Sequence, residues 1–213
     1  MDSRAGAVLT VASPLLADRA LVVRATELQP TRWRNGGGTT RELHVGPACD
    51  HGLAAWRLSL ATIATDGPFS AFPGVDRSLL LLSSTSLRLD VDGRANGLGQ
   101  YDRLEFPGEA AVVAGTDGRT SEVLNLMTCR ACTRGTVLVR EYDGMHSLSL
   151  PDPAALVLLG GTARHDSGAL HPHDTVVLSP APTQVVFRSA RVAAVSLTTS
   201  GSPTAHPQKG DER

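Results

Sequence analysis

Trp33-Arg34-Asn35-Gly36-Gly37-Gly38-Thr39-Thr40-Arg41-Glu42-Leu43 joins three consecutive glycines to a segment in which side-chain character alternates. Glycine reaches positive φ and admits the close approach of other groups, although ordering it costs more conformational entropy than ordering any other residue. The alternation after the glycines predicts a β-strand. One face of this strand would carry Thr39, Arg41, Leu43 and Val45, and the other Thr40, Glu42 and His44. We therefore expect a tight corner that leads directly into a strand.

The glycine run does not fit a nucleotide-phosphate loop. Such a loop needs a helix behind it, so that free N–H groups and the helix dipole face the anion. A strand is expected here instead, and the dinucleotide fingerprint requires a different glycine spacing. Two interpretations stay open: a plain turn at the start of a strand, and a corner that helps to form a ligand site.

Short apolar segments separated by turn residues continue along the chain, with almost no helical periodicity. Asp66-Gly67-Pro68 and Gly160-Gly161 predict turns, and Asp92-Gly93 predicts a hairpin. This pattern is typical of an all-β barrel or sandwich. One strand is expected before the glycines, at residues 20–28. Those expected after the strand that follows the glycines span residues 56–65, 78–82, 87–91, 104–106, 111–114, 123–128, 137–142, 156–159, 175–178, 185–187 and 192–197.

Four segments resemble the HutD/Ves family: WRNGGGTTREL (33–43), WRLSLATIATDGPFSAFPGVDRSLLLL (56–82), FPGE (106–109) and LNLM (124–127). They occur in the order typical of the family, and the resemblance covers roughly residues 21–198. It implies a cupin-like fold in which two tandem β-barrel halves (a bicupin) pack as one unit. It also implies an association with histidine utilisation, as a regulatory or ligand-binding protein.

The chain is expected to divide into four parts. Residues 20–142 would form the first cupin-like half and 143–199 the second, and the element order of the second weakly parallels that of the first. Residues 200–213, rich in Ser, Pro, Gly and charge, are typical of a disordered tail. Residues 1–19 would form a flexible arm. A signal peptide is the alternative there, but Asp2 and Pro14 interrupt the charge and apolar pattern that it needs.

Composition excludes several classes of partner. The 213 residues carry a formal net charge of −1, so no basic footprint for nucleic acid exists, and 4% aromatic residues offer few stacking platforms. No apolar run approaches the ~20 residues that cross a bilayer. The small, odd number of cysteines suits a reducing compartment, and we expect a cytoplasmic protein. A homodimer stays open.

The cysteines offer a weak metal signal. Cys129 and Cys132 form a C-x-x-C motif, but a redox centre of the thioredoxin type needs that motif beside a helix. A zinc site that recruits Cys49 and His51 is the alternative, and one C-x-x-C is poor evidence for it. We therefore expect unpaired, reduced cysteines. The HutD/Ves family usually has a basic residue at the position of Cys129, so this chain departs from the family there.

A metal centre of the usual cupin kind is not expected. It needs histidines and a carboxylate that converge from neighbouring strands, and residues 79–113 contain no histidine. His171 and His173 imitate a ligand pair, with His165 as the nearest third, but Pro172 places them in a turn. We expect exposed turn histidines and no metal or cofactor. We assign no catalytic residue, because no Gly-x-Ser-x-Gly elbow is present.

The favoured function is the binding of a small anionic metabolite in the first half. Arginine can hold a carboxylate with two parallel hydrogen bonds, and residues 67–74 would form either a pocket lid or a hydrophobic plug. Arg57 would point inward or lie at the wet end of its strand, and Asp76 and Arg77 would pair with each other or with a neighbour. The candidate ligand-binding residues are Asn35, Gly37, Thr39, Arg41, Arg57, Ser59, Ser70, Phe72 and Arg77.

The resemblance suggests an intermediate of histidine degradation as the ligand, such as urocanate or a formylated glutamate derivative. The alternative functions are a metal-independent isomerase or hydrolase that acts on the same compounds, and a regulator that binds only protein.

Overall fold

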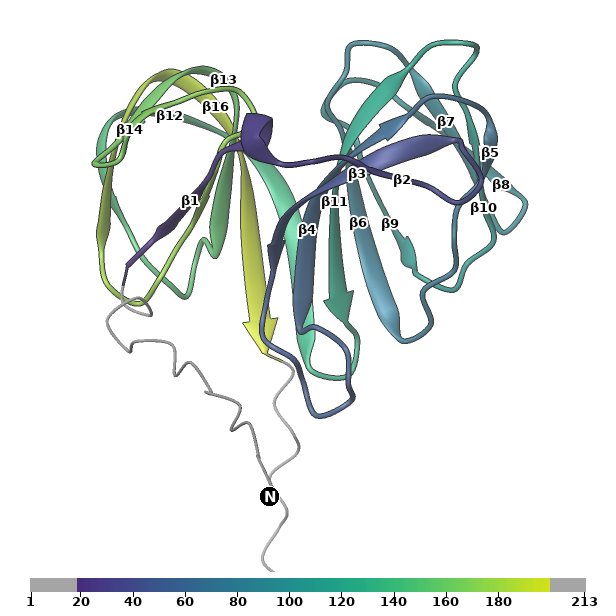
Figure 1. Cartoon of the computed structure of the whole chain (residues 1–213), viewed down its shortest axis with the longest axis horizontal. Coiled ribbons are helices and arrows are strands. Elements are labelled where there is room, and N and C mark those ends of the chain that lie inside the picture. The colour runs from purple at the N-terminus through teal and green to yellow at the C-terminus, as the bar shows by residue number, and fades with distance from the viewer. Residues whose placement is uncertain (1–18, 200–213) are drawn as a thin grey trace, which may run out of the picture.

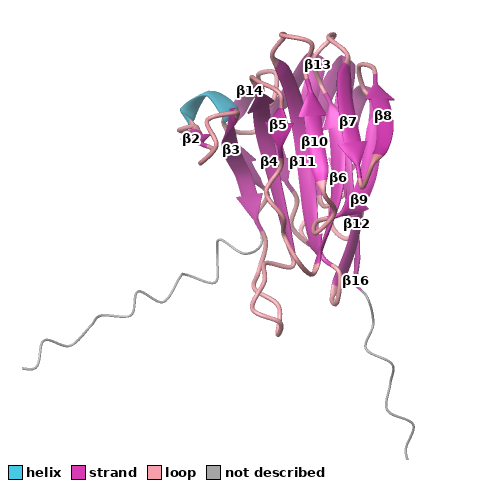
Figure 2. Cartoon of the chain, turned by 90° about the vertical axis from the view of Figure 1, so that its right-hand side faces the viewer, coloured by secondary structure: helices cyan, strands magenta, loops and turns pink. Residues whose placement is uncertain are grey.

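β-Strands account for nearly all of the regular structure in the computed structural model, which describes residues 19–199 (Figures 1 and 2). The expected arm, apart from residue 19, and the expected tail lie outside these residues. The first strand of the described chain is β1 (Leu21–Val23). The strands of the first half follow: β2 (Thr31–Arg32), β3 (Gly38–Val45), β4 (Trp56–Ile63), β5 (Gly67–Pro68), β6 (Val75–Leu81), β7 (Leu87–Val91), β8 (Arg94–Leu98), β9 (Arg103–Pro107), β10 (Val112–Gly115) and β11 (Ser121–Cys129). They are followed by β12 (Thr133–Leu148), β13 (Ala155–His165), β14 (Gly168–Leu170), β15 (Thr175–Val177) and β16 (Thr183–Thr199).

Two sheets form the first half. A six-stranded sheet has the order β2-β3-β4-β11-β6-β9, and a four-stranded sheet has the order β5-β10-β7-β8. A core that includes Ile63, Leu79, Leu89, Phe106 and Val123 fills the space between them. The expected hairpin at Asp92-Gly93 joins β7 to β8, and both of its residues have positive φ, of 50° and 81°.

The second half is built on one sheet with the order β1-β15-β13-β16-β12, and β14 pairs with β13. Figure 1 shows its long strands curling around an interior of their own. Phe187, Val185, Leu156 and Val192 are buried in that interior. The all-β architecture with two packed halves expected from the sequence is therefore confirmed.

A third core joins the halves. Leu58 and Leu126 of the six-stranded sheet pack in one buried cluster with Val157 and Val195 of the second half. Strand β4 is consequently buried on both faces, as expected for a strand between two packed layers.

The sheets divide the chain at a different place from the expected boundary at residues 142 and 143. That boundary falls inside β12, which pairs with β16 from its first residue, Thr133. Strand β1, from the start of the described chain, pairs with β15 and completes the sheet of the second half (Figure 1). The long-range pairing of β1 cannot be read from local sequence, because it depends on a partner more than 150 residues away.

Several local expectations were wrong. Gly67 and Pro68, expected in a turn, form strand β5, and the two strands expected at 185–187 and 192–197 are one strand, β16. Residues 20–28 do not form one strand: β1 ends at Val23, and a 3-10 turn, η2 (Ala25–Glu27), follows. Gly160-Gly161 is not a turn but lies within β13, where the register against β16 shifts. A Cβ at Gly161 would lie 2.2 Å from the backbone oxygen of Ser189, and its φ is +75°. The glycines therefore allow a bulge where two strands approach closely.

No helix among residues 19–199 is long and apolar enough to span a membrane.

Candidate functional site

A cavity of about 750 Å³ opens in the first half, on the face of the six-stranded sheet that looks toward the four-stranded sheet. Its floor comes from β4, β6 and β11, and β3 closes one side. The glycine corner and residues 68–72 complete the wall. The glycine corner and the loop at residues 67–74, for each of which a place at a ligand site was one of two open interpretations, therefore meet around one cavity.

Strand register explains how the floor is assembled. Met127 of β11 lies opposite Arg57 of β4 on one side and Arg77 of β6 on the other. Asn125 lies between Ser59 and Leu79 in the same way. Residues directly opposite each other in an antiparallel sheet project from the same face, so these two rows point together into the cavity.

Arg77 is a buried cation without an acidic partner. Its side chain is only 8% exposed, and its Nε and Nη2 atoms both donate to Oδ1 of Asn125, at 3.2 and 3.1 Å. No Asp or Glu among residues 19–199 forms an ion pair with it. Burial alone lowers the pKa of Arg77 to about 10, because a charged guanidinium loses its hydration in the interior.

Three aromatic rings surround this guanidinium. Its central carbon lies 5.1 Å from the ring centre of Phe69, 5.7 Å from that of Phe72 and 5.0 Å from that of Phe106. The negative faces of such rings attract a cation and partly offset its desolvation. The charge is thus held in place at the cavity without being neutralised.

The other charged groups of the lining are also mostly basic. Arg57 Nε lies 2.6 Å from Oε2 of Glu42, an ion pair whose alignment does not make a hydrogen bond. Glu42 is the one acidic side chain in the lining, against four arginines, which are Arg32, Arg34, Arg57 and Arg77. The cavity therefore carries an excess of positive charge that favours an anion.

The glycine corner owes its sequence to backbone geometry. Gly36 has a φ of +72°, and a Cβ at Gly38 would lie 2.2 Å from the backbone oxygen of Thr62. Asn35 Oδ1 accepts from the N–H of Gly37 at 3.0 Å, and its Nδ2 donates to the carbonyl of Pro68 at 3.1 Å. The amide of Asn35 therefore fastens the corner to the loop, and Gly37 belongs to the same turn.

Six of the nine candidate residues line the cavity: Asn35, Arg57, Ser59, Ser70, Phe72 and Arg77. Gly37, Thr39 and Arg41 do not. Thr40 and Glu42, from the opposite face of β3, line it instead. The alternation of this strand was predicted correctly, but nothing in the alternation says which face looks inward.

Asp76 and Arg77 do not pair with each other, because adjacent residues on a strand point to opposite faces. The alternative, an ion pair with another neighbour, holds for Asp76 but not for Arg77. Asp76 accepts from Arg130 at 2.7 Å, and Arg130 also makes two hydrogen bonds to Glu109. These bonds lower the pKa of Glu109 to about 2.

Several lining residues were missed in the sequence. Trp33 donates from Nε1 to Oγ1 of Thr40 at 2.8 Å and meets Phe69 edge to face, with 5.9 Å between ring centres. Asn125 was the residue with a readable signal, since a single amide interrupts the apolar LNLM segment. The remaining lining residues that were not expected include Thr31, Arg32, Arg34, Glu42 and Met127.

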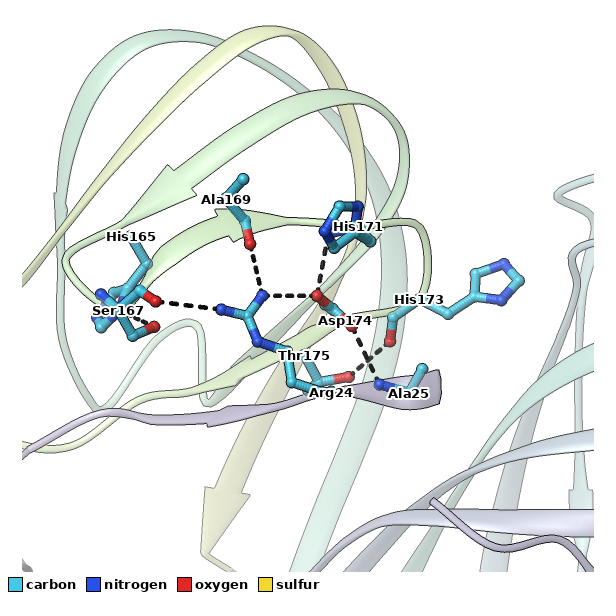
Figure 3. Close-up of polar contacts among 9 residues, drawn as sticks. All are labelled: Arg24, Ala25, His165, Ser167, Ala169, His171, His173, Asp174 and Thr175. Atoms are coloured by element: carbon cyan, nitrogen blue, oxygen red, sulfur yellow. Dashed lines mark hydrogen bonds and ion pairs between the residues drawn. The ribbon is translucent and has the colours of Figure 1, made fainter. Parts of the chain in front are cut away.

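The histidines considered as metal ligands lie near a buried carboxylate of the second half, Asp174 (Figure 3). Their turn surrounds Asp174, which is 1% exposed and pairs with Arg24 at 2.7 Å. Asp174 also accepts from the backbone N–H groups of Ala25 and His171, at 3.0 and 2.9 Å. Figure 3 shows the rings of His165, His171 and His173 directed apart, and in the described part of the chain they form no ligand group.

Comparison with known proteins agrees with this architecture. Residues 25–195 match the family model described as HutD. The chain is 39% identical to Protein Ves of Escherichia fergusonii over 103 residues. This aligned segment covers 47% of this chain and 53% of that protein. It is 32% identical over 145 residues to an uncharacterized 21.2 kDa protein in the hutC 3′ region of Pseudomonas putida, covering 68% and 74%. The chain thus spans about half the length of the Ves proteins that it matches.

Solved structures give the same result. HutD from Pseudomonas fluorescens SBW25 superposes with a TM-score of 0.71 at 25% identity, covering 86% of this chain and all of that one. A Cupin 2 conserved barrel domain protein from Leptotrichia buccalis superposes with a TM-score of 0.55 at 10% identity, covering 84% and 100%, and supports the cupin-like fold alone. With its fold, motifs and family match in agreement, this chain belongs to the HutD family.

Proposed function

We propose that this chain binds a small carboxylate metabolite in the cavity of its first half, without a metal, as a regulatory protein of histidine utilisation. The observation that carries the proposal is Arg77, a buried guanidinium at a cavity with no Asp or Glu paired to it among the described residues. A buried charge is costly unless it is paired. A carboxylate ligand would supply the missing negative charge through charge-assisted hydrogen bonds.

The size and walls of the cavity suit a metabolite. Ligand pockets commonly enclose about 300–1,000 Å³, and this one holds about 750 Å³. Urocanate, a planar ring joined to a carboxylate, would place its ring against Phe69, Phe72 or Trp33. A formylated glutamate, with two carboxylates, would use Arg77 together with a second arginine such as Arg57. The relative in the hutC region and the HutD family membership support a ligand from histidine degradation.

The test is a thermal-unfolding screen of the purified chain with urocanate and N-formyl-L-glutamate, beside urocanate methyl ester and N-formyl-L-glutamate dimethyl ester, in which every carboxylate is esterified. A ligand that binds only the folded state stabilises it by about 2.7 kcal/mol at a concentration of 100 Kd. We expect the acids to raise Tm by a few degrees and the esters to leave it unchanged. Equal shifts from acid and ester, or no shift from either acid, would overturn the proposal.

The same incubations separate binding from turnover. A binding protein leaves the ultraviolet absorbance of urocanate and the mass of N-formyl-L-glutamate unchanged over hours. Steady consumption of either compound in proportion to protein concentration would instead establish the alternative, a metal-independent isomerase or hydrolase.

A further inference from the structure

Three cysteines from two separate loops converge at one end of the six-stranded sheet. Cys49 lies in the loop between β3 and β4, Cys129 is the last residue of β11, and Cys132 lies in the turn that leads to β12. Their sulfur atoms all lie within 4.8 Å of one another. The Sγ atoms of Cys49 and Cys129, 80 residues apart, are separated by 3.3 Å.

Backbone hydrogen bonds hold both loops in this arrangement. The N–H of Cys49 donates to the carbonyl of Leu53 at 2.8 Å, and that of Gly52, which has a φ of +74°, donates back to Cys49 at 2.9 Å. The N–H of Cys132 donates to the carbonyl of Cys129 at 3.1 Å and closes the C-x-x-C turn. A bond of 3.0 Å from Cys129 to the carbonyl of Ala55 joins the two loops. These bonds fix the backbone that carries the three thiols.

The spacing fits a shared metal ion. Zinc–sulfur bonds of ~2.3 Å in a tetrahedron place two sulfurs about 3.8 Å apart, within the range of separations seen here. A disulfide between Cys49 and Cys129 would employ only two of the three sulfurs and leave Cys132 without a role. Cys129 is 1% exposed, whereas Cys49 and Cys132 are partly exposed, so an ion can enter from solvent.

We propose that Cys49, Cys129 and Cys132 form a binding site for a thiophilic divalent metal ion, Zn²⁺, whose fourth position is filled by water. The three thiols bind as thiolates, and their protons pass to solvent when the ion enters. The ion would link the β3–β4 loop to the β11–β12 turn and stabilise the end of the sheet. None of the three cysteines lines the carboxylate cavity, so the two sites are separate.

The test is a titration of the full chain, purified without an affinity tag and kept reduced, with Zn²⁺ against a chromophoric chelator. We expect one tightly bound ion per chain and an unfolding midpoint that rises with Zn²⁺ and falls again with EDTA. The matched variants are Cys49→Ser and Cys132→Ser at partly exposed positions, each checked for folding by circular dichroism. Each should weaken binding more than tenfold, since loss of an outer-shell partner alone costs ~10–100-fold.

The control is the variant His171→Ala/His173→Ala, which removes the histidine pair considered as metal ligands in the second half and should bind Zn²⁺ like the unmodified chain. Failure of the reduced chain to take up Zn²⁺, or uptake that survives both cysteine substitutions, would overturn the proposal. A loss of two mass units on air oxidation, in a chain that binds no Zn²⁺ when reduced, would assign the cluster to a disulfide instead. Metal content and carboxylate binding are measured independently, so either result stands without the other.

Discussion

Arg77 and Asn125 form the polar centre of an otherwise apolar floor. Asn125 is 5% exposed, and its side-chain oxygen accepts both hydrogen bonds that Arg77 makes within the described chain. The amide oxygen accepts from Nε and Nη2 of the guanidinium but does not neutralise its charge. The residue pair therefore orients a cation toward the cavity and leaves the charge available to a ligand.

A double-mutant cycle tests this interdependence. Asn125→Leu removes the acceptor and leaves a buried guanidinium unsatisfied, so we expect a loss of about 3 kcal/mol of unfolding free energy. Adding Arg77→Met removes the orphaned charge as well, and replacing both partners by apolar groups is often close to neutral. The double variant should therefore be more stable than Asn125→Leu alone in urea unfolding. Additive losses would contradict the account.

For single residues, the sequence predicted which side chains lie at the cavity better than it predicted what surrounds each of them. Arg57 and Ser59 were expected at the ligand site, and the face of β4 that carries them looks into the cavity. Arg77 was expected in an ion pair with Asp76 or with another neighbour and is buried among aromatic rings instead. A period of two assigns residues to two faces but does not name the inward face when both are apolar. For the same reason Arg41 was placed at the cavity and Asn125 was not.

Among the elements, the glycine corner has the strictest geometry. Gly38→Ala would place a Cβ 2.2 Å from the backbone oxygen of Thr62 on the neighbouring strand. Backbone cannot move aside as a side chain does, so we expect a loss of about 2 kcal/mol or more. Gly97→Ala in β8 is the matched control, because a Cβ there meets nothing within 4 Å. A change of less than ~0.5 kcal/mol is expected for it, and equal effects in urea unfolding would contradict this explanation.

The segment from β1 to η2 is held by Asp174. Burial raises the pKa of this carboxyl, but hydrogen bonds from His171, Arg24 and Ala25 outweigh that effect, and the net pKa is lowered. A lowered pKa in the folded state contributes stability above the unfolded value of ~3.9 and loses it as pH falls through the folded value.

Asp174→Asn therefore gives a pH-dependent difference from the unmodified chain. We expect the variant to be less stable by about 1–3 kcal/mol at pH 7. That gap should narrow as unfolding in urea is repeated at pH values falling below ~3.9, where the carboxyl of the unfolded chain gains its proton before that of the folded chain. Other acidic groups titrate equally in both proteins and cancel in the comparison. A gap that stays constant from pH 7 to pH 3 would show that Asp174 acts without its charge.

Element positions were largely predictable, and the errors share one cause. Turn residues such as Asp92-Gly93 act locally, so that hairpin was placed correctly. The 3-10 turn after β1 depends on Asp174, about 150 residues away, and the bulge at Gly161 depends on Ser189 in another strand. Local sequence carries no signal for partners at such distances.

The whole molecule is held together by the core between its halves. Leu126 is fully buried there, in one cluster with Val157 and Val195 of the second half. Since β12 and β1 join the sheet of the second half, the halves are interleaved in sequence as well as packed together. The cupin-like class was predictable from strand spacing and family motifs, whereas this interleaving was not, because it depends on long-range pairing.

We expect such an arrangement to unfold as one unit. Both tryptophans, Trp33 and Trp56, lie in the first half, so their fluorescence reports on that half while far-ultraviolet circular dichroism reports on both. The two transitions should coincide in urea. Leu126→Ala should shift both together by about 2–5 kcal/mol. Separate transitions, or a shift in only one signal, would mean that the halves fold independently.

The central claim is that the cavity binds a carboxylate through Arg77, and isothermal titration calorimetry tests it most directly. N-formyl-L-glutamate and urocanate are titrated into the unmodified chain, into Arg77→Met and into Arg94→Met, which removes an exposed arginine outside the cavity lining. The account predicts that the unmodified chain and Arg94→Met bind at least one of these acids equally well. It predicts that Arg77→Met, folded by circular dichroism, binds it about 100-fold more weakly. Equal affinity in all three proteins, or no binding to the unmodified chain, would contradict it.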